Sequence, residues 1–564
     1  MFGAELMARA VERQGVRTVF GIPGHLEAFF GALQERDIRL INQRHEAACV
    51  LSADGYARAR RGVGVACVTA GPGLANALAG LATTYQACTP LLLICGRNEF
   101  SLAEAGALQE MDHPSAARSL TKATLTVHEA SRLGEYVDLA CRIALSGRPG
   151  PVLLEVPRNL PLQQVDEAIA APSLRPLVRP PRPRAAAEAI QRAAGVLMEA
   201  ERPLIIAGNG AYWGEGGAGL RRLVEELRLP VLAHDLARGL VPEDMELAFP
   251  WPVASIAARH EDDVGTRMDF RISYAAPPYF RDDARFIQVD IDGAEIGRNR
   301  YVESPVVGDC GPALEALAVE LARREYQPRD PAWAAAALSD RLAQIDSLGR
   351  EETGMVHPLR MARELAARMP ANAIFVSDGA NCANWFKSVV RVRESPGWLD
   401  YDPFGSMGVG LPLAIGAVAA QQEGGSSRPV FLGAGDGALG QYLGELATAS
   451  LHGMPLFIMV ANDGAWGASR GITLRTFGGT YGVEMSQSRY DLVAQGLECH
   501  GEIAATPDEV GPAFDRALAA VRRGKPALVN VLVDREASGQ RGGDLQMVPF
   551  NRDWPPRPVV PAAG

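Results

Sequence analysis

Short apolar runs alternate with amphipathic segments from one end of the chain to the other, and this alternation predicts parallel α/β units. A first group of strand-like runs lies at 16–24, 38–43, 62–70, 90–96 and 151–157. A second group includes 202–213 and 284–292, and a third comprises 373–379, 429–437, 456–464 and 527–533. Continuous apolar runs of this length are typical of strands that are buried on both faces of a sheet. The first and third groups look like one architecture used twice.

Boundaries between the groups follow from composition. The stretch 172–184 is rich in Pro and Arg, which excludes regular helix and indicates a linker. The fold class expected is therefore α/β, with three doubly wound parallel-sheet domains at 1–170, 185–325 and 355–535. Residues 536–564 show no periodicity, and a disordered tail and a lid over the substrate are the two alternatives for them.

Bulk properties narrow the class of protein. The 564 residues are 47% hydrophobic and 22% charged, and the net charge of -10 argues against a nucleic-acid partner. No apolar run is long enough to span a membrane, and residues 1–15 predict an amphipathic helix with charges of both signs, not a signal peptide. The eight cysteines include no Cys-x-x-Cys pair, so neither disulfides nor a zinc site are expected. These properties predict a cytoplasmic enzyme.

Two aspartates follow apolar runs of the third group. Asp436 comes after the run at 429–435 within Gly-Asp-Gly, and Asp463 comes after the run at 456–462. Taken singly, Asp436 could be a helix N-cap, and Asp463-Gly464 could be a hairpin turn. If the two strands are parallel neighbours, however, both side chains lie at one sheet edge, where ligands bind. Two carboxylates beside helix N-terminal amides suit Mg²⁺ bound to a diphosphate.

At this point the sequence resembles a known family. Gly-Asp-Gly followed by Asn-Asp after such an interval is similar to the thiamine diphosphate (ThDP) motif of the acetolactate synthase and pyruvate oxidase superfamily. The resemblance implies that Mg²⁺ is bound by Asp436, Asp463 and the carbonyl of Ala465. The family usually has Asn where this chain has Asp463, which supplies the same oxygen with more charge. By the same resemblance the cofactor also contacts Gly435, Gly437, Ala438, Trp466 and Gly467.

A second match concerns the activation of the cofactor. Glu46 ends the segment Ile-Asn-Gln-Arg-His-Glu, where a strand should pass into a helix. A carboxylate at a helix N-terminus is favoured by the helix dipole alone. The segment nevertheless resembles that of the family's catalytic glutamate, which lies against the aminopyrimidine ring and promotes removal of the C2 proton. In the family this glutamate and the diphosphate motif come from different subunits, so the resemblance implies a homodimer or homotetramer with active sites at the subunit interface.

Further segments match the family's cofactor and substrate loops. Residues 405–417 resemble the segment whose methionine, here Met407, separates the two cofactor rings, although a core methionine is the simpler alternative. The loop at 376–381 matches one that touches the diphosphate through Gly379, Ala380 and Asn381. His25 lies where relatives vary a substrate-facing residue, with a structural histidine as the alternative. Gln109 should face the thiazolium side.

The middle domain is less informative. In relatives it binds ADP, coenzyme A (CoA) or FAD, or nothing, and Gly208-Asn209-Gly210 after an apolar run is only a partial nucleotide fingerprint. Residues 254–270 lack the apolar strand that relatives have before Gly-Thr-Arg, so we expect this part of the domain to be remodelled.

Details around the metal motif bear on the reaction. Residues 462–471 differ from the corresponding stretch of true acetolactate synthases and look more like 2-hydroxyacyl-CoA lyases and oxalyl-CoA decarboxylases. This resemblance implies cleavage of a 2-hydroxyacyl-CoA to formyl-CoA and an aldehyde or ketone, with Glu484 as the base for the substrate hydroxyl. A solvated glutamate is the alternative for Glu484. Acetolactate synthase-like chemistry on pyruvate or another 2-oxo acid is the alternative reaction.

Overall fold

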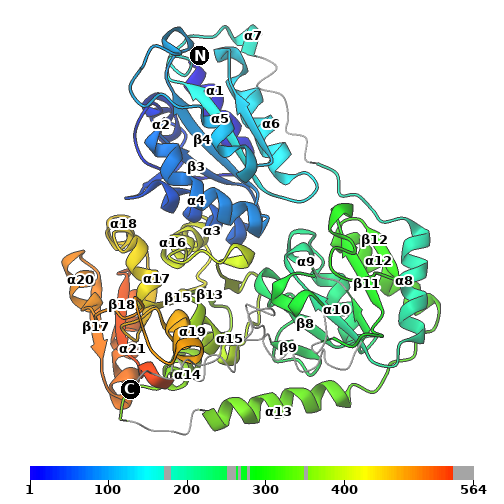
Figure 1. Cartoon of the computed structure of the whole chain (residues 1–564). Helices are drawn as coiled ribbons and strands as arrows, with labels where there is room; N and C mark the ends of the chain where they lie inside the picture. Colours follow the sequence, from blue (N-terminus) through cyan, green and yellow to red (C-terminus); the bar gives the residue numbers. More distant parts are fainter. Residues whose placement is uncertain (171–179, 251–261, 265–267, 276–279, 349–353, 538–564) are drawn as a thin grey trace.

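The computed structural model describes residues 1–170, 180–250, 262–264, 268–275, 280–348 and 354–537. These residues form three domains, each built around a six-stranded sheet (Figure 1). Every pairing between named strands is parallel, as the alternating apolar runs predict. The α/β class with three parallel-sheet domains is confirmed.

The first domain has the strand order β2-β1-β3-β4-β6-β5. Its strands are β1 (Thr18–Gly21), β2 (Arg39–Asn42), β3 (Gly64–Val68), β4 (Leu91–Arg97), β5 (Ala123–Thr126) and β6 (Pro151–Pro157). Its helices are α1 (Gly3–Arg13), α2 (Glu27–Gln34), α3 (Glu46–Arg60), α4 (Pro72–Ala87), α5 (His113–Ala117), α6 (Leu133–Leu145) and α7 (Glu167–Ala170). The amphipathic helix expected at the N-terminus is α1, whose apolar side is buried.

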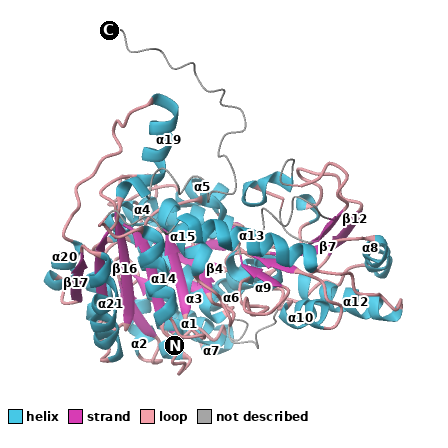
Figure 2. Ribbon diagram, turned by 90° about the horizontal axis from the view of Figure 1, so that it is seen from below, coloured by secondary structure: helices cyan, strands magenta, loops and turns pink. Residues whose placement is uncertain are grey.

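The third domain repeats this order as β14-β13-β15-β16-β18-β17, which supports one architecture used twice. Its strands are β13 (Ile374–Asp378), β14 (Trp398–Leu399), β15 (Val430–Gly435), β16 (Leu456–Asn462), β17 (His500–Ala504) and β18 (Ala527–Leu532). Its helices are α14 (Pro358–Arg368), α15 (Ala380–Val389), α16 (Gly410–Glu423), α17 (Asp436–Leu439), α18 (Glu445–Leu451), α19 (Gly467–Phe477), α20 (Tyr490–Gly496) and α21 (Pro507–Arg522). Helix α19 projects from the body of the molecule in Figure 2.

The middle domain has the order β12-β11-β10-β7-β8-β9, in which the direction of winding reverses between β7 and β10. Its strands are β7 (Pro203–Ala207), β8 (Val231–Ala233), β9 (Ala248–Pro250), β10 (Asp262–Val264), β11 (Phe286–Asp290) and β12 (Ser304–Val307). Its helices are α8 (Ala187–Glu199), α9 (Asn209–Trp213), α10 (Gly217–Glu225) and α12 (Cys310–Arg323), and α13 (Ala332–Leu348) leads to the third domain (Figure 1).

Most of the stretch 254–270, where we expect local remodelling, lies outside the described part of the chain, which here comprises 262–264 and 268–270. A strand does precede Gly-Thr-Arg, because Asp262–Val264 form β10 between β11 and β7. The strand was missed because it is three residues long and begins with two aspartates, so that it lacks the apolar pattern. The hydrogen bonds of β10 to β7 and β11 join backbone groups, so residues without an apolar pattern can form them.

The first and third domains pack through helices α3 and α16. A Cβ on Gly416 would lie 1.9 Å from the carbonyl oxygen of Ser52, and one on Gly55 would lie 2.2 Å from that of Leu413. The Ser52 hydroxyl also donates a hydrogen bond of 2.8 Å to the carbonyl of Pro412. Two glycines thus let the helix backbones touch, which fixes the third domain against the helix that begins at Glu46.

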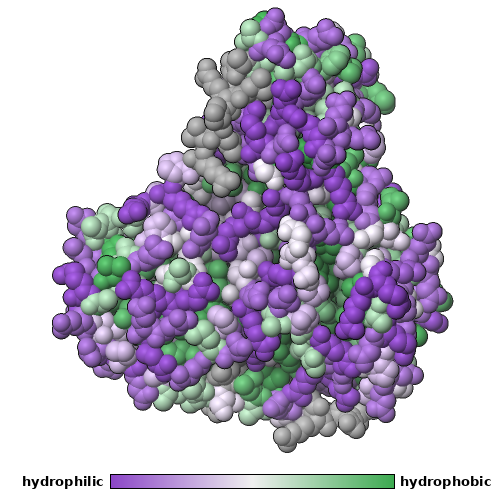
Figure 3. Space-filling model, turned by 180° about the vertical axis from the view of Figure 1, so that it is seen from behind, coloured by the Kyte–Doolittle hydropathy of each residue, from purple (hydrophilic) through white to green (hydrophobic). Residues whose placement is uncertain are grey.

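Hydrophilic residues cover most of the face shown in Figure 3. No described helix combines the length and the apolar composition that crossing a bilayer demands. A disordered tail and a lid are the two alternatives for residues 536–564. All of these residues except 536 and 537 lie outside the described part of the chain.

Candidate functional site

The predicted cofactor loops meet at the carboxyl ends of β13, β15 and β16. These strands are parallel neighbours, with Asp378 opposite Ala434 and Gly435 opposite Ala461. The order of the sheet reverses between β13 and β15, and crevices at such points are where α/β sheets bind ligands. The chain continues in parallel after Asp463, so the hairpin alternative for this turn is wrong.

Asp436 and Asp463 are buried at this edge, being 2% and 6% exposed. The carboxylate of Asp436 accepts hydrogen bonds from the amides of Gly437 (2.9 Å) and Gly464 (3.0 Å), so it joins the two loops. Asp463 accepts one from the amide of Ala465 at 3.0 Å. Burial raises the pKa of Asp436 to about 7, and the charge of Asp463 acts in the same direction. A cation between the two carboxylates would relieve both effects.

Three glycines leave room for a ligand-binding arrangement that side chains would block. A Cβ on Gly467 would lie 2.4 Å from Oδ2 of Asp463 and 2.9 Å from Nδ2 of Asn381. A Cβ on Gly437 would lie 2.6 Å from the Trp466 ring, and Gly379, with φ of +89°, lies against Gly435. The predicted residues of the third domain, 379–381, 435–438 and 463–467, are therefore brought together. Carboxylate oxygens beside the starts of α15 and α19 fit Mg²⁺ and a diphosphate.

The turn that carries Met407 is held at the same edge by Asp378, a residue that was not among the predicted site residues. Asp378, at the end of β13, accepts hydrogen bonds from the amides of Gly410 (2.7 Å) and Gly408 (3.3 Å). Burial raises the pKa of Asp378 to about 7, while these amide donors act in the opposite direction. Asp378 therefore holds the turn that carries Met407, which is 37% exposed and so is not the buried core methionine of the alternative. An aspartate directly after a buried strand was the pattern that could have identified it.

In the first domain, His25 and Gln109 share a partner. Thr69 Oγ1 lies 2.8 Å from Nδ1 of His25 and donates to Oε1 of Gln109 at 3.2 Å. Both residues have positive φ, 61° and 62° respectively, so loop geometry holds them in place. Glu46 begins α3 as predicted and accepts a hydrogen bond from Asn76 Nδ2 at 2.9 Å. These hydrogen-bond partners all belong to the first domain.

His113 and Glu155 form a buried pair that was not predicted from the sequence. His113 is 1% exposed, and its Nδ1 lies 2.7 Å from Oε1 of Glu155. Its Nε2 accepts a hydrogen bond of 2.8 Å from the amide of Gly71, and a Cβ on Gly71 would lie 2.7 Å from the carbonyl oxygen of Gln109. The proton on Nδ1 therefore points to Glu155, and the pair fixes the turn against Gln109. The sequence separates these residues too widely to have indicated the pair.

Glu484 lies next to the 463–465 loop but is not free. Its backbone pairs with Ala465, and the Met485 amide donates to the Gly464 carbonyl at 2.7 Å. Its carboxylate accepts from Nε of Arg470 (3.1 Å) and Nη1 of Arg535 (2.6 Å). Slight desolvation would raise the pKa of Glu484, but the hydrogen bonds from Arg470 and Thr480 and the charge of Arg535 hold it below its ordinary value. Acting as a base requires that this carboxylate turn away from both guanidiniums, and that role stays a prediction.

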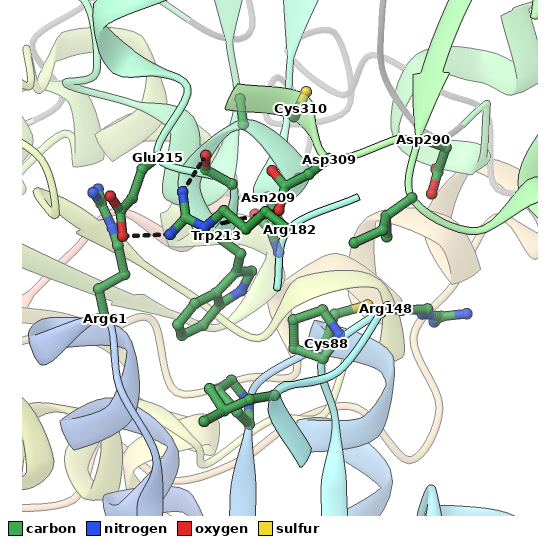
Figure 4. Close-up of a pocket in the computed structure, with 18 of the residues that line it drawn as sticks. Arg61, Cys88, Arg148, Arg182, Asn209, Trp213, Glu215, Asp290, Asp309 and Cys310 are labelled. Atoms are coloured by element: carbon green, nitrogen blue, oxygen red, sulfur yellow. Dashed lines mark hydrogen bonds and ion pairs between the residues drawn. The ribbon is translucent and has the colours of Figure 1, made fainter. Parts of the chain in front are cut away.

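A separate cavity of about 320 Å³ lies between the first and middle domains (Figure 4). Gly208-Asn209-Gly210, which follow β7, and Asp290, which ends β11, line it on the middle-domain side. Five arginines and three carboxylates face it, and Arg148, Arg182 and Arg271 also form ion pairs, with Glu295, Glu215 and Asp269 respectively. Guanidiniums in such number suit an acidic ligand. The arginines are Arg61, Arg142, Arg148, Arg182 and Arg271. The partial fingerprint at 208–210 therefore belongs to a formed pocket at the point where the sheet reverses.

Comparisons with known proteins agree with this architecture. The chain matches the family models of the thiamine pyrophosphate enzymes in three places: the N-terminal TPP binding domain over residues 1–116, the central domain over 190–317 and the C-terminal TPP binding domain over 378–531.

Individual relatives are similar over nearly their whole length. The chain is 33% identical to the "Acetolactate synthase large subunit IlvG" of Mycobacterium tuberculosis, over 97% of this chain and 98% of that protein. It is 28% identical to the human "2-hydroxyacyl-CoA lyase 1", over 95% of both chains. It is 29% identical to the "2-hydroxyacyl-CoA lyase 2" of Caenorhabditis elegans, over 94% of this chain and 90% of that protein.

Proposed function

Because the chain belongs to the thiamine diphosphate-dependent enzymes, we propose that it cleaves a 2-hydroxyacyl-CoA to formyl-CoA and an aldehyde or ketone, and catalyses the reverse condensation. ThDP, when bound, supplies stabilisation of the carbanion that such a cleavage produces. The protein has to orient the substrate, exclude water and move protons.

Mg²⁺ and the diphosphate would be held by the third domain. Asp436, Asp463 and the Ala465 carbonyl bind the metal, and the loops at 379–381 and 435–438 bind the phosphates. This assignment is supported by the buried carboxylate pair and by the raised pKa of Asp436. Met407 would lie between the two rings of the cofactor, on the turn that Asp378 holds.

Glu46 would promote removal of the proton from the cofactor, with His25 and Gln109 nearby on the substrate side. Their polar partners are in the first domain, so we propose a homodimer or homotetramer in which they face the 463–467 segment of a second copy. The exposed apolar side chains of Ile472 (43%) and Phe477 (67%) on α19 support this arrangement, since a second subunit would cover them.

The choice of an acyl-CoA substrate is carried by the arginine-lined cavity. CoA contains an adenine nucleotide diphosphate, and the same chemistry occurs in ADP and FAD. Calorimetric titration of the ThDP-loaded protein with each of the three ligands separates these sources. Binding of CoA, weakened by Arg148→Ala, supports the proposal, whereas binding of ADP or FAD alone assigns the cavity to a resident nucleotide.

Acetolactate synthase-like carboligation is the second candidate, favoured by the name of the 33% identical relative. Incubation of the enzyme, ThDP and Mg²⁺ with a 2-hydroxyacyl-CoA, and separately with pyruvate, tests both reactions. We expect formyl-CoA and an aldehyde or ketone from the first mixture, with Asp463→Ala as the inactive control. Turnover of pyruvate alone would remove the lyase proposal and leave the carboligase.

A further inference from the structure

The 463–465 loop is backed by a guanidinium from the far end of the domain. Nε of Arg535 donates to the carbonyl of Asp463 at 2.7 Å, and its Nη2 donates to the carbonyl of Gly464 at 2.9 Å. Gly464 has φ of +61°, and a Cβ there would lie 2.6 Å from Nη2 of Arg535. The guanidinium therefore lies directly against the backbone, and it satisfies the two carbonyls that precede that of Ala465.

Arg535 is itself held by a row of alternating charges. Its Nη1 donates to Oε2 of Glu484 at 2.6 Å, and Oε1 of Glu484 accepts from Nε of Arg470 at 3.1 Å. Nη2 of Arg470 donates to Oε1 of Glu536 at 2.6 Å. These four residues, Arg470, Glu484, Arg535 and Glu536, are called the arginine clasp below. They join α19, the 483–485 segment and the chain after β18 around one loop.

We propose that Arg535 positions the backbone carbonyl of Ala465 as a metal ligand, and that Glu484 acts by orienting Arg535. This proposal rests on the proposed roles of Asp463 and Ala465 as metal ligands. A turn through a left-handed glycine has a soft backbone, while metal ligands must stay within about 0.2 Å of their proper distances. Two charge-assisted hydrogen bonds to successive carbonyls restrict that turn.

Glu484 has both carboxylate oxygens engaged in the clasp, which distinguishes this role from that of a base. A base is needed for the substrate's proton, whereas a positioning carboxylate is needed before any substrate arrives. Loss of the Glu484 charge should therefore change cofactor binding if it positions Arg535, and turnover alone if it is the base.

The test measures ThDP affinity by calorimetry, and the Mg²⁺ concentration that gives half-maximal ThDP binding, for Arg535→Lys and Glu484→Gln. Lysine keeps the charge, but it lacks the planar guanidinium that lets arginine bind two carbonyls and a carboxylate at once. We expect about 10- to 100-fold weaker Mg²⁺-dependent ThDP binding for Arg535→Lys, the usual effect of losing a group that orients a metal ligand. Glu484→Gln should show a smaller loss in the same direction.

Arg516→Lys is the matched control, because Arg516 forms a similar two-bond ion pair with Glu502 in the same domain, with distances of 3.0 and 2.8 Å. It should leave both quantities unchanged. Parent-like ThDP and Mg²⁺ binding in Arg535→Lys and Glu484→Gln would overturn the clasp, provided that Asp463→Ala still abolishes binding. If Asp463→Ala also binds like the parent, the metal site itself is wrong. A general structural role would lower the melting temperature without moving the Mg²⁺ midpoint, and Glu484→Gln decides the question if Arg535→Lys does not fold.

Discussion

A single methyl group at Gly467 should impair cofactor binding without unfolding the protein. Gly467 is the first residue of α19, and a Cβ there would lie 2.4 Å from Oδ2 of Asp463 and 2.9 Å from Nδ2 of Asn381. Ordinary van der Waals contact begins near 3.4 Å, so in Gly467→Ala the carboxylate must retreat by 1.0 Å (3.4 less 2.4). The shift is several times the roughly 0.2 Å within which metal–ligand distances are held.

The size of the effect follows from the same clash. Inserting a methyl group into a packed site costs about 1–3 kcal/mol, which corresponds to about a 5- to 150-fold loss of affinity when the strained group is a ligand. Alanine is otherwise better than glycine in a helix by about 1 kcal/mol, which offsets part of any loss of stability. We therefore expect Mg²⁺-dependent ThDP binding to weaken by one to two orders of magnitude, with little change in the melting temperature of the cofactor-free protein.

Calorimetric titration of ThDP at fixed Mg²⁺ measures the first quantity, and thermal unfolding without cofactor measures the second. Gly479→Ala is the matched control, because a Cβ at Gly479, just beyond the end of α19, meets nothing within 4 Å. Parent-like affinity in Gly467→Ala would refute the placement of Asp463 as a ligand at this edge.

Three further predictions concern Glu46, the contact between α3 and α16, and Asp378. Glu46→Gln should slow exchange of the cofactor's C2 proton by about 10²- to 10⁴-fold, measured by NMR, with ThDP affinity retained; an unchanged exchange rate would remove Glu46 from the relay. Gly416→Ala should lower the melting temperature, since its Cβ would lie 1.9 Å from the Ser52 carbonyl, whereas Gly424→Ala in the same region should not; equal melting temperatures would contradict the close contact between α3 and α16. The raised pKa of Asp378, about 7 against an ordinary 3.8, means that its contribution to stability is fully present below pH 4 and is lost as the pH rises through 7. It amounts to about 4 kcal/mol, so Asp378→Asn should flatten the fall in stability of the cofactor-free protein between pH 4 and 7, and an identical slope would show that Asp378 is not buried as described.

Much of the fold could be predicted because it depends on local pattern. Buried parallel strands are continuous apolar runs, and the approach of Asp436 to Asp463 follows once two such runs are neighbours. Strand β10 was missed because its existence depends on backbone pairing with β7 and β11, not on its own side chains. The pattern of apolar residues could not indicate a strand that begins with two aspartates.

The supporting residues of the site could not be predicted for a different reason. Arg535 contacts the carbonyl of Asp463 from 72 positions away, and His113 contacts Glu155 across 42. Such contacts depend on the three-dimensional arrangement of loops, and no local pattern marks an arginine as the partner of a distant carbonyl. Asp436 and Asp463 could be predicted as a pair because each follows a strand directly, and the other residues of the proposed cofactor loops were predicted from the family resemblance. The residues that hold those loops in place required the structure.

The residues that line the cavity between the first and middle domains could not be predicted either. Its positive groups come from separate segments of the first domain, the linker and the middle domain, and Arg148 and Arg182 were not distinguishable in the sequence from other surface arginines. Gly208 and Gly210 follow an apolar run and could be predicted to form a loop near a ligand.

The central claim is that Asp436 and Asp463 hold Mg²⁺ against the diphosphate of ThDP. Calorimetric titration of ThDP into the parent protein and into Asp463→Ala, each with Mg²⁺ and with a chelator in its place, tests it most directly. The account predicts tight binding only for the parent with Mg²⁺, and a large loss in the variant or with the chelator. Equal ThDP affinity in all four titrations would contradict it.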